Sequence, residues 1–183
     1  MTFEDIKECF VSAKKTDAKG RKHKGLLIAE PNQWLAEHYI TKARENLEDC
    51  DYYRKKRRDY KLPEAWFYTL YYCALAILSK FGVETRSQKC TAVFLRYVRD
   101  KELIKYDDDF IERITVYPEK EHMTDVDKRE EARYGPSIQI KEVQDKYAEM
   151  MDICKKAIEQ CRDIVYSDKP LNIPKELLNA IKL

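Results

Sequence analysis

The segment REEARYGP, residues 129–136, combines residue types that can bind and cleave a phosphate diester. Arg129 carries a fixed positive charge, which stabilises negative charge that develops on a phosphate. Cleaving RNA without a metal also needs a group that titrates near neutral pH, because the ribose 2′-hydroxyl must lose a proton and the leaving oxygen must gain one. The segment contains no histidine, and Pro136 transfers no protons. It therefore predicts phosphate binding more strongly than catalysis.

Arg129, Arg133 and Tyr134 allow two interpretations. In the first, the two arginines lie four residues apart on one helix face and pair with carboxylates, while Tyr134 packs at the helix end. In the second, the arginines bind phosphate oxygens, because the guanidinium fork matches them, and Tyr134 stacks on a base or offers its hydroxyl. Both interpretations stay open from the sequence.

The composition indicates helices as the elements that position this segment. The chain has 183 residues, of which 44% are hydrophobic and 37% charged, with only four glycines and six prolines. This length suits one domain with a real core, and the composition favours an all-α fold with few turns. Periodicity and capping residues predict the following helices: 3–15, 33–56, 64–81, 87–99, 107–114, 125–134, 141–166 and a tail helix from residue 174.

Two of these helices predict an antiparallel bundle. Between residues 33 and 56, apolar residues recur in steps of four and three and form one seam, as packing in a bundle requires. Between residues 64 and 81 nearly every position is apolar or aromatic, with Pro63 suited to the first turn and Gly82 suited to the end. Such a helix belongs at the bundle centre, or at the centre and at a subunit interface.

Charge and cysteines restrict the partners and the compartment. The net charge of +2 is not that of a general nucleic-acid binder, so any basic surface that binds a partner must be local. Two segments could form such a surface: residues 14–25 and RKKRR at 54–58. The alternative for both segments is that they are merely solvent-exposed, as charge runs usually are. No apolar stretch is long enough for a membrane span and no export signal is evident, which predicts a cytoplasmic protein without a membrane partner. The six cysteines contain no CxxC pair, which predicts reduced, buried thiols and neither a metal site nor a cofactor.

Three segments together resemble the HEPN family, the α-helical domains of prokaryotic toxin pairs and other RNA-directed defence proteins. HYITKARENLEDCDYY resembles the opening helix of the family, and AWFYTLYYCALAILSKFGVETRSQKCT is similar to its central helix and the loop that follows. REEARYG resembles the Arg-x-x-Ala-x-Tyr-Gly of many members. The resemblance covers residues 38–166. The order and spacing of the three segments make it more specific than any one of them.

The resemblance implies a four- or five-helix up-and-down bundle that forms a homodimer with a cleft between the copies. It divides the chain into an N-terminal helix and basic loop (1–30), a HEPN-like bundle (31–168) and a C-terminal tail helix (169–183). Active members carry Arg-x4-Tyr-x-His at the cleft, and here Pro136 replaces the histidine. Losing such a group typically costs about 10²–10⁴-fold in rate. Arg86, in the loop after the central helix, joins Arg129, Arg133 and Tyr134 as a candidate binding residue.

No other histidine stands at the motif spacing. His122 lies seven residues before Arg129, His38 lies on the opening helix and His23 belongs to the basic loop. Some relatives carry a second histidine where this chain has Gln88. A histidine from the second subunit remains as a possible replacement, although a lone histidine is more often structural or merely exposed.

Three functions compete. The first is a HEPN-type dimer that binds RNA or a nucleotide, as half of a module with a nucleotidyltransferase; in related pairs the partner attaches AMP to the motif tyrosine, which makes Tyr134 a candidate for modification. The second is an active metal-independent endoribonuclease, in which Arg129 is catalytic. The third is a non-catalytic helical scaffold. The first is the hypothesis we favour, because Arg129 and Tyr134 keep their spacing while the histidine is missing.

Overall fold

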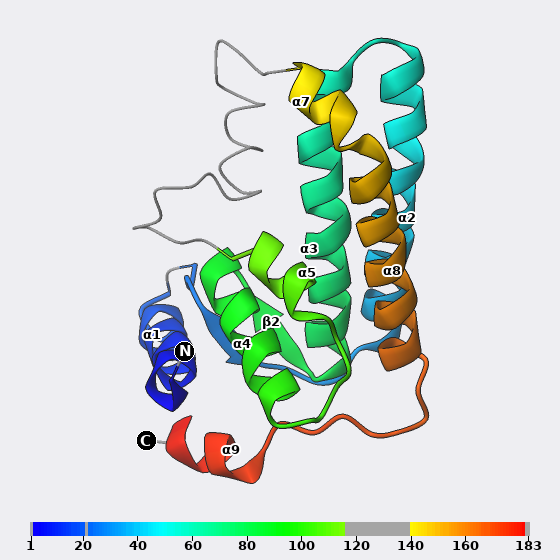
Figure 1. Ribbon diagram of the computed structural model, residues 1–183. Coiled ribbons are helices and arrows are strands. Elements are labelled where there is room, and N and C mark those ends of the chain that lie inside the picture. Colours follow the sequence, from blue (N-terminus) through cyan, green and yellow to red (C-terminus); the bar gives the residue numbers. More distant parts are fainter. Residues whose placement is uncertain (1, 21, 116–139, 182–183) are drawn as a thin grey trace.

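A computed structural model describes residues 2–20, 22–115 and 140–181, and helices make up most of them (Figure 1). The prediction of a mostly helical fold is confirmed, although the described part also contains a two-stranded sheet. Three long helices form a bundle: α2 (Gln33–Lys55), α3 (Leu62–Lys80) and α8 (Tyr147–Val165). The 3-10 helix η1 (Asp59–Lys61) lies in the turn between α2 and α3, so these two helices run antiparallel.

The last long helix is interrupted, contrary to the prediction of one helix over residues 141–166. The short helix α7 (Ile140–Asp145) comes before α8, and Lys146 separates them. Lys146 still donates its backbone N–H to the carbonyl of Glu142, and Met150 donates to the carbonyl of Lys146, so the helical hydrogen bonds continue across the junction. Figure 1 shows α7 at the same end of the bundle as the turn between α2 and α3.

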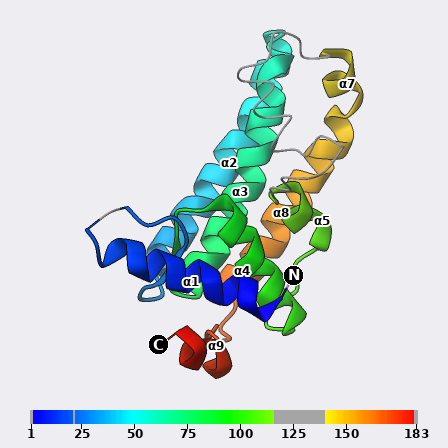
Figure 2. The same cartoon turned by 90° about the vertical axis from the view of Figure 1, so that its left-hand side faces the viewer.

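Four shorter helices lie beside or below the bundle. They are α1 (Phe3–Asp17), α4 (Gln88–Asp100), α5 (Asp108–Arg113) and α9 (Lys175–Ile181). In both views α1 lies against α4, and α9 lies at the lower end of the molecule, close to α1 (Figures 1 and 2). The N-terminal and C-terminal helices therefore pack at the same end of the structure.

The sheet was not predicted from the sequence. Strand β1 (Leu26–Ile28) pairs antiparallel with β2 (Val83–Thr85), with Leu26 opposite Thr85 and Ile28 opposite Val83. Each strand has only three residues, too few for alternation of apolar and polar side chains to be recognised. The pairing joins the segment before α2 to the segment after α3, and so ties the N-terminal region to the bundle.

Capping residues explain where the helices begin. Thr2 and Asp5 form a capping box at the start of α1, in which the Thr2 N–H donates to the Asp5 carboxylate at 2.6 Å. The side chains of Asn32 and Ser87 accept from backbone N–H groups in the first turns of α2 and α4. Such caps satisfy amide groups that have no partner within the helix.

The hydrophobic core is continuous from α1 to α9. The predicted seam of α2 is confirmed, because its buried residues are Ala36, Ile40, Ala43, Leu47 and Cys50. Helix α3 lies between α2 on one side and α4 and α5 on the other, with α8 also packed against it (Figure 1). It buries most of its residues, and one stripe is only half-buried: Glu64, Tyr68, Tyr71, Tyr72 and Leu75. Within the described residues, no helix is both long and apolar enough to cross a bilayer.

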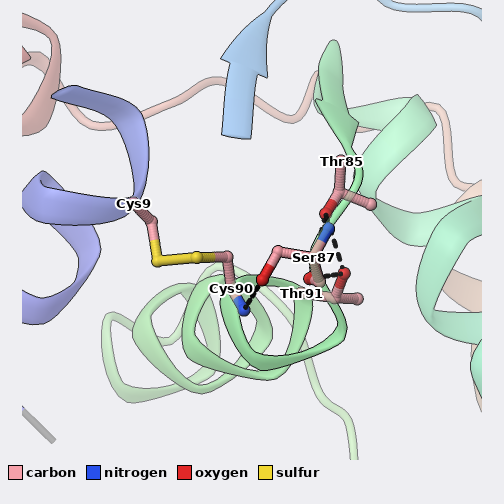
Figure 3. Close-up of a disulfide and its surroundings, with 5 residues drawn as sticks. All are labelled: Cys9, Thr85, Ser87, Cys90 and Thr91. Carbon is pink, nitrogen blue, oxygen red and sulfur yellow. Dashed lines mark hydrogen bonds between the residues drawn. A yellow bond between two sulfur atoms is a disulfide. The ribbon is translucent and has the colours of Figure 1, made fainter. Parts of the chain in front are cut away.

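The prediction of reduced cysteines is wrong for one pair. Cys9 on α1 and Cys90 on α4 form a disulfide, with their Cα atoms 5.8 Å apart (Figure 3). Their separation of 81 residues in the sequence gave no sign of this pairing. They meet because α1 packs along the first turn of α4, where the Ser87 hydroxyl accepts the Cys90 N–H. The other cysteines, which are buried and free, are Cys50, Cys73, Cys154 and Cys161.

Gly82 provides a test of the turn between α3 and β2. Its φ is +70°, and a Cβ there would come within 2.6 Å of the Ala29 carbonyl oxygen. We expect Gly82→Ala to lower the free energy of unfolding by about 2 kcal/mol or more, because left-handed backbone alone costs about 1–2 kcal/mol without glycine. Gly20→Ala is the control, since Gly20 has φ +66° but no atom within 4 Å of a built Cβ. Urea unfolding of both variants should show the larger loss for Gly82→Ala; equal losses would contradict the predicted clash.

Candidate functional site

The predicted motif residues lie outside the described part of the chain. Arg129, Arg133, Tyr134 and Pro136 all fall between residues 116 and 139, so their geometry is not described. The next described residue is Ile140, which begins α7. Helix α7 packs against η1, so the described chain resumes at the end of the bundle that carries the RKKRR run.

The RKKRR run forms an exposed basic turn, a name used here for residues 54–58. Helix α2 ends within the run at Lys55, and the chain reverses at Arg57, whose φ is +54°. The turn is held by backbone hydrogen bonds, one of them from the Arg58 N–H to the Tyr53 carbonyl at 2.8 Å. All five cationic residues of the turn are exposed. The end of α2 and the segment that follows it thus present a dense group of positive charges at one end of the bundle.

Within the described ranges, the last four cations of the basic turn are not paired with acids. Among the described residues, no carboxylate forms an ion pair with Lys55, Lys56, Arg57 or Arg58. Asp59 follows the run directly, but its side chain is buried and accepts a hydrogen bond from Gln144 at 2.9 Å. The nearest acid in the sequence is therefore turned towards α7 and away from the exposed cations.

Exposed tyrosines flank the basic turn. Tyr52 is 48% exposed and Tyr60 is 42% exposed. The Lys61 ammonium lies 5.7 Å from the centre of the Tyr60 ring. Cations interleaved with exposed aromatic rings can bind both components of a nucleic-acid strand, because the cations attract phosphates and the rings offer stacking surfaces.

A partly buried contact beside the basic turn joins α8 to α2. The Tyr147 hydroxyl donates to the Asp51 carboxylate at 2.7 Å, and the Arg54 guanidinium lies 4.2 Å from the centre of the Tyr147 ring. Trp66 packs against Tyr147, with the ring centroids 6.2 Å apart. Burial, and secondly the hydrogen bond to Asp51, raise the pKa of Tyr147 above its ordinary value. Tyr147 therefore stays protonated and ties α8 to the last turn of α2.

The sequence did not reveal this contact. Asp51 and Tyr147 are 96 residues apart, and neither belongs to a recognisable motif. Arg54 was predicted only as part of a charge run. The available signal was periodicity, because Leu47, Asp51 and Arg54 follow one another in steps of four and three along α2, and such residues share one side of a helix.

The structure places Arg86 at the opposite end of α2. Its backbone N–H donates to the Gly25 carbonyl at 3.1 Å, and its side chain donates to Glu84 at 3.2 Å. It lines a cavity of about 490 Å³ together with Asn32 and Tyr39, both at the start of α2. Since α2 rises about 1.5 Å per residue, roughly 25 Å separate Tyr39 from the basic turn along the helix. Arg86 is therefore not part of the surface around the basic turn.

The described histidines lie away from the basic turn. His23 is 3% exposed, and its Nε2 lies 3.4 Å from the Glu84 carboxylate near β2. His38 is exposed in the second turn of α2, where its ring stacks on Trp34. Gln88 donates its side-chain amide to the Ile114 carbonyl at 3.1 Å. None of these three residues lies at the end of α2 that bears the basic turn.

The arrangement at the basic turn suits the binding of a polyanion. Its cations supply charge and its tyrosines supply stacking surfaces, but no described histidine is present there to transfer a proton. Within the ranges that the structure describes, no three His, Cys, Asp or Glu side chains are grouped as a metal ion would require. No known family model matches the chain, and no curated protein sequence matches it.

Proposed function

We propose that this chain is a HEPN-type helical protein that binds RNA through the basic turn, and that it does not cleave RNA efficiently. The observation that carries the proposal is the exposed run of Lys55, Lys56, Arg57 and Arg58, which has no ion pair within the described part of the chain. A polyphosphate backbone is the natural partner of such a run, because binding releases counterions from the nucleic acid.

The sequence resemblance supports RNA as that polyanion. In the proposed function, the bundle is the up-and-down helical bundle of the HEPN family, and two copies form a homodimer. Arg129 and Arg133 add phosphate contacts, and Tyr134 stacks on a base or accepts AMP from a partner nucleotidyltransferase. Pro136 stands at the position of the motif histidine, so binding is retained where the general acid or base is lost.

The test is the affinity of the protein for a labelled RNA at several salt concentrations. In the test variant, Lys55, Lys56, Arg57 and Arg58 are all replaced by glutamine. We expect affinity at low salt to fall by about 10–100-fold, and the slope of log K against log salt to decrease by about 3, because each lost phosphate contact contributes about 0.7 for a single strand. Fluorescence anisotropy measures both quantities.

A matched control removes the same number of charges elsewhere. Lys14, Lys15, Lys19 and Lys22 are exposed in and after α1, and replacing all four with glutamine changes the net charge equally. This control is expected to bind RNA almost as well as the parent. If both variants lost affinity equally, binding would depend on net charge and the basic turn would not be the site. If the parent bound no RNA even at low salt, the proposed function would fall.

A further inference from the structure

Two exposed tyrosines stand before and after the cations of the basic turn. Tyr52 lies in the last turn of α2, where its carbonyl accepts the Lys56 N–H at 3.0 Å. Tyr60 lies in η1, and the Lys61 N–H that follows it donates to the Arg58 carbonyl at 2.9 Å. The hydrogen bonds that shape the turn therefore hold an aromatic side chain at each of its ends.

Both rings keep surface that is open to solvent. Tyr52 is 48% exposed, and its centroid lies 6.0 Å from that of Tyr53 with the ring planes inclined by 63°. A neighbour at this angle covers at most one face of a ring, so within the described part of the chain Tyr52 keeps the other face for stacking. Tyr60 is 42% exposed, and the Lys61 ammonium lies over its ring, 5.7 Å from the centroid. A cation on one face of Tyr60 leaves the opposite face for a base.

Acidic side chains around the basic turn are fewer than the cations. Residues 49–61 contain six lysines and arginines and three aspartates. Asp51 and Asp59 each accept a hydrogen bond from a side chain of α8 or α7, at 2.7 and 2.9 Å, and Asp59 is also buried. The exposed Asp49 lies one helical turn before Tyr53, whose pKa is raised first by burial and secondly by the charge of Asp49. Positive charge is thus concentrated at the end of the bundle, while Asp49 makes the adjoining side of α2 unfavourable for phosphates.

The compactness of the basic turn favours one strand of RNA over a duplex. Its four unpaired cations are consecutive, at residues 55–58, and the chain reverses among them at Arg57. Double-stranded RNA is bound through contacts spread across its shallow minor groove, to 2′-hydroxyls and to phosphates beside it. An unpaired strand instead brings phosphates and free base faces to one place, which matches a small group of cations with a ring at each end.

We propose that the basic turn binds single-stranded RNA, with phosphates on residues 55–58 and unpaired bases stacked on Tyr52 and Tyr60. This inference rests on the proposed function and specifies its ligand. Bases in a duplex already stack on one another and offer no face to a protein ring, so the two tyrosines discriminate against duplex RNA. Every base has a π-face, and the same contacts therefore tolerate any sequence. Arg54 takes no part, since its guanidinium lies on the Tyr147 ring.

The test removes both rings and measures single strands and duplexes separately. The leucine variant, Tyr52→Leu with Tyr60→Leu, keeps apolar side chains, whereas the phenylalanine variant, Tyr52→Phe with Tyr60→Phe, keeps both rings. For labelled oligouridylate, the leucine variant is expected to bind at least about tenfold more weakly than the parent, and the phenylalanine variant to bind as the parent does. The slope of log K against log salt should be equal in all three proteins, because the rings release no counterions. A labelled RNA duplex of the same length should also bind equally to all three.

A matched control removes two exposed aromatic side chains elsewhere. Trp34→Leu with Tyr166→Leu changes residues that are 71% and 53% exposed, at the start of α2 and at the end of α8. Trp34 lies about 27 Å from Tyr52 along α2, so this control is expected to bind oligouridylate as the parent does. Circular dichroism checks the folding of each variant. If the leucine variant does not fold, Tyr60→Leu alone is measured, with an expected loss of about fivefold for one stacked base.

The inference and the proposed function fail in different ways. The inference is overturned if the leucine variant keeps parental affinity for oligouridylate while the four-glutamine variant of the basic turn loses it; RNA then binds through charge alone, and the proposed function stands. Equal losses for single strand and duplex would also overturn it, because the rings would then shape the turn instead of stacking on bases. A parent that binds the duplex more tightly than oligouridylate contradicts the inference but leaves RNA binding intact. A parent that binds neither RNA at low salt refutes the proposed function, and the inference with it.

Discussion

Replacing Cys9 and Cys90 with serine is expected to lower the free energy of unfolding by about 4 kcal/mol. The disulfide joins residues 81 positions apart, so it restricts the unfolded chain over almost half its length. Chain-entropy models give about 3 kcal/mol for a 15-residue loop and about 4.7 kcal/mol for a 100-residue loop. Guanidinium denaturation of the oxidised parent and of the double variant measures the difference.

The folded structure should change little when the disulfide is removed. Ile6, Phe10 and Ala13 of α1 are buried in the core independently of the sulfur atoms. Helix α1 is therefore expected to stay in place, with an unchanged circular dichroism spectrum. The parent treated with a reductant is the control, because it loses the bond but keeps both cysteine side chains. If the reduced parent unfolded at the same denaturant concentration as the oxidised parent, the disulfide would not contribute to stability.

Local signals in the sequence predicted the helices well. Thr2 and Ser87 cap helices in the structure as the sequence predicts, and Gly82 takes the left-handed conformation expected at the end of α3. The apolar seam of α2 is buried as its periodicity indicates. These features depend on residues three or four positions apart, which is the range over which capping and periodicity act.

Features that depend on distant residues were missed. The Cys9–Cys90 disulfide, the pairing of β1 with β2 and the hydrogen bond of Tyr147 to Asp51 each join segments more than 50 residues apart. Which of six cysteines pair cannot be deduced from spacing without the fold. Among the functional predictions, too, local features were recognised and those that depend on the fold were missed. The RKKRR run was recognised as basic, but its position at the end of the bundle, far along α2 from Arg86, depends on the packing of the helices.

Raising the pH above about 9 is expected to destabilise the protein progressively. Burial, and secondly the charges of Asp51 and Asp49, raise the pKa of Cys50 from 9.0 to about 12. The pKa of a thiol in the unfolded chain stays near its ordinary value, so above pH 9 the unfolded chain releases a proton that the folded protein retains. The corresponding stability is fully present below pH 9 and is lost as the pH rises towards 12, to an extent on the order of 4 kcal/mol.

Several tyrosines also make the folded protein less stable as the pH rises. Burial raises the pKa of Tyr39, Tyr72 and Tyr106 above the ordinary value of 10.0, so each also resists ionisation in the folded protein. Their contribution begins to be lost at a higher pH than that of Cys50, because an unfolded tyrosine titrates later than an unfolded thiol. Midpoints of urea unfolding between pH 7 and 11 should therefore fall slowly from pH 9 and more steeply above pH 10.

The variant Cys50→Ala distinguishes the contribution of the thiol to the pH dependence of stability from that of the tyrosines. The variant is less stable at pH 7 because it loses buried atoms, but its stability should depend less on pH between 9 and 10 than that of the parent. Tyrosine absorbance at high pH provides the second readout, since the buried phenols are expected to ionise together with unfolding. A parent whose urea midpoint was constant from pH 7 to 11 would show that Cys50 and the buried tyrosines titrate alike in the folded and unfolded chains, and the packing around them would then be looser than the structure shows.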